Sequence, residues 1–231
     1  LKQIQESKYG NTYVINCIDD EFASGAAAVA IYGGTFVGFD PNVSPEQKVD
    51  GVTPSFAAPG VGITKNADGT FTAVKDMTAQ LLDADDSSVK AYTSLADAIT
   101  AASEGQIVRL LADAKEDVTI DKNITLDLGG KTLTNNGAGK ATITIAEGAT
   151  ATVKNGSVAG GTSYYNIQNN GTATFEGLTA TAGNDGSSMI DNVGTLTITS
   201  GEYTGGLDTI KNEPNAKLTV DGGTFTLTKG T

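Results

Sequence analysis

Apolar residues return at a nearly constant spacing in the second half of the chain. Val153, Phe175, Ile198 and Val220 each end a short run in which threonine alternates with other residues, and glycine follows soon after. Successive anchors are 22, 23 and 22 residues apart, and residues 126–133 form a weaker, earlier copy. Alternation with a period of two is typical of a β-strand with one buried face. The pattern therefore predicts a repeat of short strands joined by turns.

A second anchor accompanies the first. Ile-x-Asn triplets at 167–169, 190–192 and 210–212 each lie a few residues before the main strand. One repeat holds too few apolar side chains to bury them alone, whereas coils stacked about 4.8 Å apart share one interior. We therefore predict an all-β fold, a right-handed parallel β-helix, or β-solenoid. Stacking would join Asn169, Asn192 and Asn212 in an amide ladder; the alternative is that each asparagine only forms its own turn.

A short helix is expected before the first coil. Ser94 and Asp97 match a capping box, in which each side chain bonds the backbone amide of the other residue. Leu95, Ala98, Ile99 and Ala102 follow with helical spacing, and residues 107–111 then read as a strand. We expect this helix to cover the open end of the solenoid core.

The chain divides into three expected segments. Residues 1–38 are predicted to be the terminal coils of a preceding module, because residues 29–36 repeat the pattern of residues 218–225. Residues 39–90 are predicted to be an irregular, proline-containing cap, a β-hairpin with an Asp68-Gly69 turn, and a linker. Residues 91–231 are predicted to hold the capping helix and the parallel β-helix, open at its C-terminal end.

Two stretches resemble known proteins. Residues 93–110, with Thr-Ser-Leu-Ala-Asp-Ala-Ile and then Gly-Gln-Ile-Val-Arg-Leu, look like the helical cap of pectate-lyase-like right-handed parallel β-helices. Residues 117–133 resemble the first coils of repeat-rich, adhesin-like surface proteins of gut bacteria. The resemblance covers about residues 91–231 and implies the β-helix fold. Polysaccharide lyases and phage fibres share this architecture, so the fold does not select an activity.

The two ends of the chain suggest an assembly. The last coil would offer an open edge, and residues 9–38 would offer a matching coil, so we expect copies to stack head to tail. Two alternatives are that the chain is a piece of a longer tandem protein, or that residues 9–38 fold back onto the same chain's edge. The residues expected at this assembly edge are Val220, Phe225, Leu227, Val14, Ile15, Ile31 and Phe36.

The composition disfavours several classes of partner and of catalytic site. The formal charge is −12, which disfavours nucleic acid and anionic membrane surfaces as partners, and no apolar run is long enough for a membrane helix. The chain has no histidine, so nucleophilic systems that need a histidine base are absent. Arg109, the only arginine, is expected in a salt bridge, and Cys17 is expected to be a buried thiol. We predict no catalytic residues, cofactor or metal site.

Two features keep binding functions open. Acidic clusters at 19–21, 83–86 and 113–117 could hold calcium, with solvated charge as the alternative. Tyr164 and Tyr165 could form a glycan contact by stacking, or could simply pack across a loop.

The sequence thus favours a non-catalytic structural or adhesive module, extracellular, on a cell surface or in a virion fibre. Its expected partners are other copies of itself, adjacent modules of a longer chain, a glycan or a host surface protein. The alternative is a carbohydrate-binding or carbohydrate-processing β-helix of the polysaccharide lyase kind.

Overall fold

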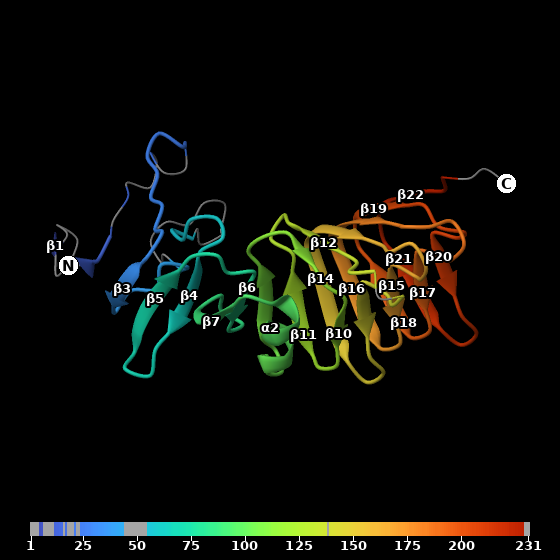
Figure 1. Cartoon of the computed structure of the whole chain (residues 1–231), viewed down its shortest axis with the longest axis horizontal. Coiled ribbons are helices and arrows are strands. Elements are labelled where there is room, and N and C mark those ends of the chain that lie inside the picture. The colour runs from blue at the N-terminus through green and yellow to red at the C-terminus, as the bar shows by residue number, and fades with distance from the viewer. Residues whose placement is uncertain are drawn as a thin grey trace.

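The structure is a computed structural model, and it describes residues 5–6, 12–15, 17, 21, 24–43, 55–137 and 139–228. The strands of the solenoid stand side by side along the long axis of the molecule (Figure 1). The N-terminal segment lies at the end where the short helix α2 (Leu95–Ala101) is found (Figure 1). None of the helices within the described ranges is long and apolar enough to cross a membrane.

One wall of the solenoid is a five-stranded sheet with one strand from each coil. All neighbouring strands in it are parallel. In spatial order they are β10 (Val118–Ile120), β13 (Ile143–Ile145), β15 (Ile167–Asn169), β17 (Ile190–Asn192) and β20 (Ile210–Asn212). The predicted parallel β-solenoid is confirmed, because each strand pairs with the strand one repeat away and not with its sequence neighbour.

The rest of each coil belongs to a twelve-stranded sheet. The chain crosses this sheet in two successive stretches per coil. The first stretch is formed by the parallel strands β8 (Ile107–Leu110), β11 (Ile124–Asp127), β14 (Thr150–Ala159), β16 (Thr172–Thr181), β18 (Thr195–Ile198) and β21 (Lys217–Val220). The second stretch is formed by β9 (Ala114–Lys115), β12 (Thr132–Thr134), β19 (Gly201–Thr204) and β22 (Thr224–Thr226). In the second and third coils one ten-residue strand, β14 or β16, spans both stretches.

The predicted apolar anchors form one column inside the solenoid. Leu126 pairs with Val153, Val153 with Phe175, Phe175 with Ile198, and Ile198 with Val220. The first four have no solvent exposure. Stacking of equivalent residues thus supplies the interior that a single coil lacks. Where two coils turn most closely, only glycine fits: a Cβ on Gly194 would lie 2.0 Å from the Gly171 carbonyl oxygen.

The N-terminal end of this core is covered. Leu95, Ala98 and Ile99 of α2 are buried in the same cluster as Val118 and Ile120 of the first coil. Two further strands, β6 (Ala79–Leu82) and β7 (Ser88–Tyr92), extend the large sheet beyond β8 with antiparallel pairing. The capping role expected for the helix is therefore shared with β6 and β7, most of whose residues lie in the segment predicted to end in a linker at residue 90.

The N-terminal segment has its own small core. β4 (Gly62–Lys65) and β5 (Thr70–Val74) form the expected antiparallel hairpin. β3 (Gly34–Val37) pairs antiparallel with β5. The short strands β1 (Gln5–Glu6) and β2 (Thr12–Tyr13) pair with each other, also antiparallel. The described part of residues 1–38 thus shows no stacked parallel coil, because β3 takes the free edge of the hairpin.

Candidate functional site

The fifth coil presents an uncovered end of the solenoid core. In the fourth coil three inward-facing side chains have no solvent exposure: Leu196, Ile198 and Tyr203. The residues that pair with them in the fifth coil are 37%, 48% and 38% exposed: Leu218, Val220 and Phe225. Leu227, just beyond β22, is also 48% exposed. Side chains at equivalent positions of the repeat are therefore buried in the fourth coil and exposed in the fifth, over which no described residue lies. We call the outer side of β20, β21 and β22 the C-terminal face.

An aromatic pair supports this face. The Phe225 ring lies over Tyr203, with centroids 5.0 Å apart and planes 11° from parallel. The Tyr203 hydroxyl donates to the Ser200 carbonyl oxygen at 3.1 Å, and burial raises the pKa of this phenol. Phe225 is thus held flat on the core while its other side remains accessible.

The strands of the C-terminal face are also edge strands. β20, β21 and β22 pair on one side with β17, β18 and β19, and the structure describes no strand on the other side. Edge strands with exposed apolar side chains are templates for pairing with another strand. The face therefore offers both apolar surface and backbone hydrogen-bonding groups.

The three asparagines of the expected ladder come together in one inward column. Asn169 donates from Nδ2 to Asn192 Oδ1 at 2.8 Å, and Asn192 donates to Asn212 Oδ1 at 2.7 Å. Asn169 and Asn192 are completely buried, whereas Asn212 is exposed on the C-terminal face.

The N-terminal residues expected to meet this face lie elsewhere. Ile31 is only 7% exposed and forms a bridge with Ala57. Phe36 packs edge-on against Phe39, with centroids 5.7 Å apart. Val14 is exposed and Ile15 is partly buried. The structure thus does not bring the two expected sets of edge residues together within one chain.

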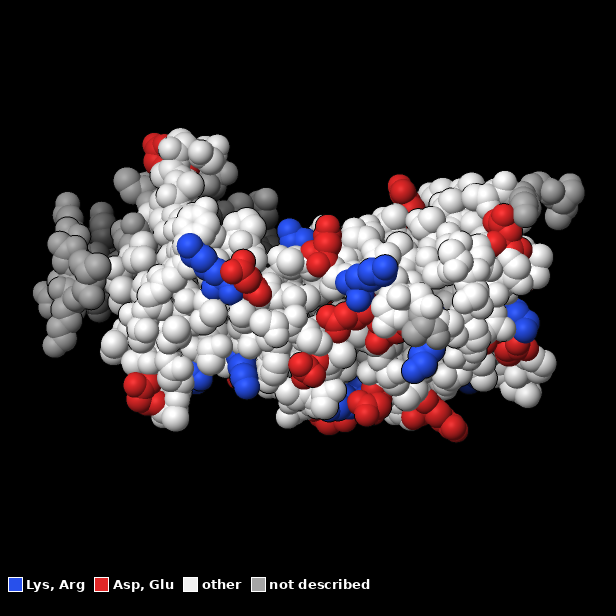
Figure 2. All heavy atoms as spheres, in the orientation of Figure 1, with Lys and Arg blue, Asp and Glu red and all other residues white. Residues whose placement is uncertain are grey.

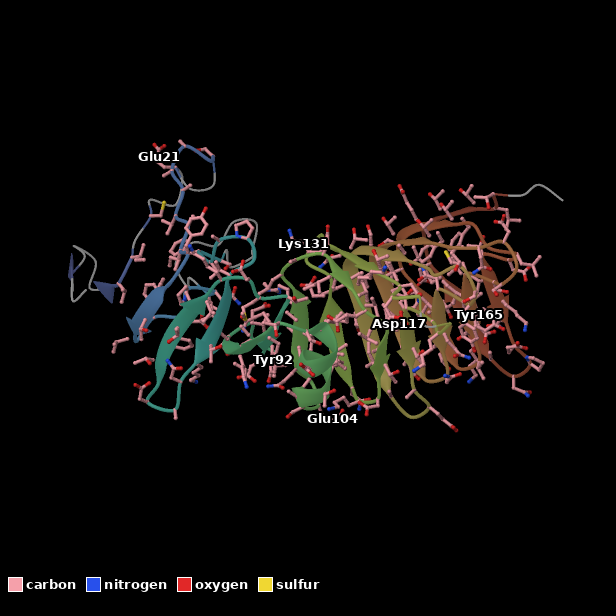
Figure 3. The ribbon with its side chains drawn as sticks, viewed as in Figure 1. Glu21, Tyr92, Glu104, Asp117, Lys131 and Tyr165 are labelled. Carbon is pink, nitrogen blue, oxygen red and sulfur yellow. The ribbon has the colours of Figure 1, made fainter. Side chains whose placement is uncertain are left out.

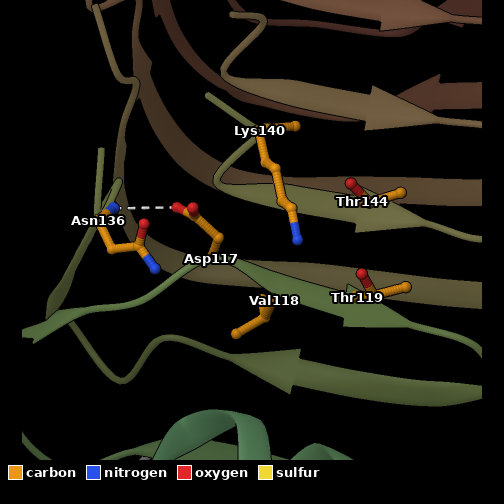
Figure 4. Close-up of a pocket in the computed structure, with 7 residues that line it drawn as sticks. Asp117, Val118, Thr119, Asn136, Lys140 and Thr144 are labelled. Atoms are coloured by element: carbon orange, nitrogen blue, oxygen red, sulfur yellow. Dashed lines mark hydrogen bonds between the residues drawn. The ribbon is translucent and has the colours of Figure 1, made fainter. Parts of the chain in front are cut away.

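A second region of interest is the outer surface of the five-stranded sheet. A hollow of about 130 Å³ is lined there by Asp117, Val118, Thr119, Asn136, Lys140, Ala141 and Thr144. Lys140 extends between Asp117 and Thr119 (Figure 4). Asp117 accepts from the Asn136 backbone amide at 2.9 Å through Oδ1, while its Oδ2 is buried without a hydrogen bond. A wider hollow of about 500 Å³, lined by Ala146, Glu147, Asn170 and Val193, continues from Thr144.

Asp191 is the unusual residue of the same surface. It occupies the outward column that also holds Gln168 and Lys211, yet it is only 4% exposed. Gln168 Nε2 lies 3.5 Å from Asp191 Oδ2, and Oδ1 has no hydrogen bond. Burial raises the pKa of Asp191; the Lys211 charge opposes this rise and the Glu213 charge adds to it. Lys211 is engaged in an ion pair with Glu213. Sequence reasoning missed Asp191, because a residue between Ile190 and Asn192 is expected to face solvent.

Tyr164 and Tyr165 lie on the loop before β15, and both are partly buried. Their ring centroids are 4.8 Å apart with an interplanar angle of 61°. The Tyr164 carbonyl accepts from Asn184 Nδ2 at 2.9 Å, which ties this loop to the next one. Tyr165 lies nearer the C-terminal end of the solenoid than Asp117 does (Figure 3). The tyrosines pack on each other across the loop and leave part of each ring accessible.

The remaining residues singled out in the sequence have structural surroundings. Arg109 bonds Asp86 at 2.7 Å and Asp127 at 3.0 Å, and Cys17 is buried. Asp19 and Asp20 lie outside the described residues. Within the described ranges, no group of three or more histidine, cysteine or acidic residues is arranged to hold a metal ion. On the face shown in Figure 2, acidic and basic side chains are scattered between wide uncharged areas.

Comparisons of the chain with protein-family models, with curated proteins and with solved structures gave no match. The C-terminal face and the outer surface of the five-stranded sheet are the two regions of the described chain with features suited to binding.

Proposed function

We propose that this chain is a non-catalytic structural module whose solenoid is lengthened by further parallel coils that stack on its C-terminal face. The observation that carries the proposal is the exposure of Leu218, Val220 and Phe225 at positions that are fully buried one coil earlier. A stacked coil would give them the neighbours that every earlier coil already has. Since full burial of such a side chain contributes about 1.5–3 kcal/mol, covering these half-exposed side chains would contribute about 1 kcal/mol each.

The finer form of this proposal is an adhesin-like module on a bacterial surface or in a fibre. The resemblance of residues 91–231 to surface proteins of gut bacteria motivates it. A threonine- and glycine-rich chain with a single cysteine and a net charge of −12 is compatible with an extracellular place. A regular stack of coils is suited to act as a spacer, because each coil contacts only its neighbours and the stack can be lengthened one coil at a time.

Extending the chain by one coil tests the structural proposal. Five residues separate Thr204 from Ile210, and five residues follow Thr226 in the sequence, so a second copy of residues 210–228 placed directly after Thr231 keeps the register. We expect the added coil to increase hydrogen-exchange protection of β20, β21 and β22. Val220→Lys should abolish this gain, because the charge would be buried between coils. Thr219→Lys, on the outward side of the same strand, is the matched control. No gain in protection would contradict the proposal.

Head-to-tail assembly of separate copies is a narrower version. It would require the segment around Ile31 and Phe36 to leave its present packing and join the C-terminal face of another copy. Light scattering and electron microscopy over a range of concentrations test it. Association that Val220→Lys removes and Thr219→Lys retains would support assembly, whereas a monomer at every concentration would exclude it.

A carbohydrate-binding function is the second candidate. Two observations favour it: the hollows that meet at Thr144, with hydroxyl, carboxylate and ammonium groups around them, and the partly exposed Tyr164 and Tyr165 rings. Saccharides are bound by such polar groups together with aromatic surfaces. Glycan-array binding that disappears in the Tyr164→Ala/Tyr165→Ala variant and persists in Tyr92→Ala would support this function. Absence of binding to any glycan would oppose it.

A further inference from the structure

The asparagine ladder has a direction. Each buried asparagine makes two bonds from Nδ2, one to the next asparagine and one to a backbone carbonyl of the next coil. Asn169 Nδ2 donates to the Thr195 oxygen at 3.0 Å, and Asn192 Nδ2 donates to the Lys217 oxygen at 3.0 Å. A carbonyl oxygen only accepts, so the amide group facing it must be NH₂. Donors therefore point toward the C-terminal face, and acceptors point back toward the first coil.

The ladder stops at Asn212 with one donor unused. Its Oδ1 accepts from Asn192, and its Nδ2 donates to Ala216 of its own coil at 3.1 Å. In the two earlier steps the same amide reaches the next asparagine and the next coil. An amide group carries two N–H donors, and no acceptor for the second N–H of Asn212 lies within the described residues. The C-terminal face thus presents one side-chain N–H donor at a fixed place beside the exposed apolar side chains of β21 and β22.

We infer that the C-terminal face selects a parallel coil that carries an asparagine in the ladder column. The incoming Oδ1 accepts from Asn212, and its coil places apolar side chains over Leu218, Val220 and Phe225. The face is continuous with the coil–coil interface that the solenoid already repeats, so its occupant is a segment of the same repeat type. This inference rests on the proposed function and adds the chemistry by which the neighbouring coil is recognised.

The same geometry disfavours a two-fold symmetric dimer through this face whose axis passes beside Asn212. In such a contact Asn212 would meet Asn212 of the partner. Both Oδ1 atoms are turned toward Asn192 of their own chain, so N–H would face N–H. Two buried donors without acceptors penalise this arrangement relative to a parallel coil, which supplies an acceptor.

The extended chain described above tests the inference when the copy of Asn212 in the added coil is varied. Three versions carry asparagine, aspartate or leucine there. Asparagine and aspartate both supply an acceptor, and leucine does not. We expect the exchange protection of β20 and β21 to be about tenfold lower with leucine than with asparagine, since an unmade hydrogen bond at a buried donor changes an equilibrium by roughly this factor. Aspartate should retain most of the protection.

Two controls separate the ladder from general packing. With Asn212→Leu in the fifth coil, the difference between asparagine and leucine copies should vanish, because the donor is gone. The copy of Lys211 faces outward beside the ladder position. Changing this residue to leucine should leave the exchange protection unchanged. Equal protection from asparagine and leucine copies would overturn the inference and leave the structural proposal standing. No protection from any copy would overturn both.

Discussion

The asparagine column shows how one residue type can both stabilise and specify a stack. The same inward column holds Ile120 and Ile145 in the first two coils and asparagine in the next three. Where the column passes from isoleucine to asparagine, Asn169 Oδ1 is buried without a hydrogen bond, which costs about 1–3 kcal/mol. The bonds to Asn192 and Thr195 offset that cost, and they also fix the register, since a slipped coil would leave buried amides unpaired.

Ile145→Asn should be tolerated better than its position suggests. The new Nδ2 would lie in the ladder column, where it can donate to the unsatisfied Asn169 Oδ1. Ile143→Asn is the matched control, because Ile143 is equally buried on the same strand and pairs with Ile167, whose side chain offers no acceptor. We expect Ile143→Asn to lower the free energy of unfolding by about 4 kcal/mol. The loss for Ile145→Asn should be smaller by about 1–3 kcal/mol, as urea denaturation would measure. Equal losses would show that Asn169 Oδ1 is not a usable acceptor.

Asp191 should make stability depend on pH in the direction opposite to most carboxylates. Burial raises the pKa of Asp191 above its ordinary value of 3.8, so the folded protein holds this proton to a higher pH than the unfolded chain does. Stability therefore falls as the pH rises from about 3.8 through the folded-state pKa. Asp191→Asn should remove this fall, so the variant is more stable than the wild type at pH 7 and equal to it in acid.

Denaturant titrations at several pH values check this prediction. Asp221→Asn removes one exposed carboxylate at the C-terminal face and controls for the change in net charge. A stability gain for Asp191→Asn that is the same at all pH values would contradict the account.

At the scale of elements, α2 is held by a residue far away in the sequence. Ser94 Oγ accepts from the Asp97 amide at 3.3 Å, as the capping box predicts. A carboxylate also takes part in this cap. Glu116 accepts from the Leu95 and Ala96 amides at 2.9 and 3.0 Å and from Ser94 Oγ at 3.0 Å. Its negative charge also complements the helix N-terminus. Glu116 thereby fixes the capping helix to the first coil.

Glu116→Ala should release this helix end. Two backbone donors of α2 lose their acceptor, so we expect the free energy of unfolding to fall by about 1–3 kcal/mol. Hydrogen-exchange protection should fall first in α2. Glu147→Ala, which removes an exposed carboxylate from a turn of the second coil, should change stability by less than about 0.5 kcal/mol. A loss spread evenly over all coils would argue against a local capping role.

The elements differ in how far the sequence predicts them. The anchors Val153, Phe175 and Ile198 could be read from periodicity, because each coil repeats the same local pattern and meets the same environment. Glu116 could not, since its partners lie 20 or more residues away and no repeat marks it. The pattern of residues 29–36 predicts a coil at β3, whereas β3 pairs with β5 along a hairpin edge that the local pattern does not reveal. Of the candidate site, the exposed residues of the fifth coil were predicted and buried Asp191 was not.

At the scale of the whole molecule, the solenoid is a one-dimensional stack whose two ends differ within the described residues. The first coil is covered by α2, β6 and β7, and it shares one core with the coils that follow. The fifth coil has a neighbour on one side only among the described residues. In such stacks stability is approximately the sum of coil terms and interface terms, so a coil with one interface is held more weakly than a coil with two. Local opening is therefore expected to begin at β20, β21 and β22.

One substitution made twice in the same column measures this gradient. Val153 and Val220 occupy equivalent inward positions three steps apart, with Phe175 and Ile198 between them, and their exposures are 0% and 48%. Val153→Ala should lower the free energy of unfolding by about 2 kcal/mol, because it leaves a cavity between two covered coils. Val220→Ala should lower it by about 0.5 kcal/mol or less, since solvent already reaches that side chain. Adding the sixth coil should raise the second loss toward the first and leave the first unchanged. If Val220→Ala were as costly as Val153→Ala in the unextended chain, the C-terminal face would already be covered in solution, and the exposed fifth coil could not be the place where the solenoid is lengthened.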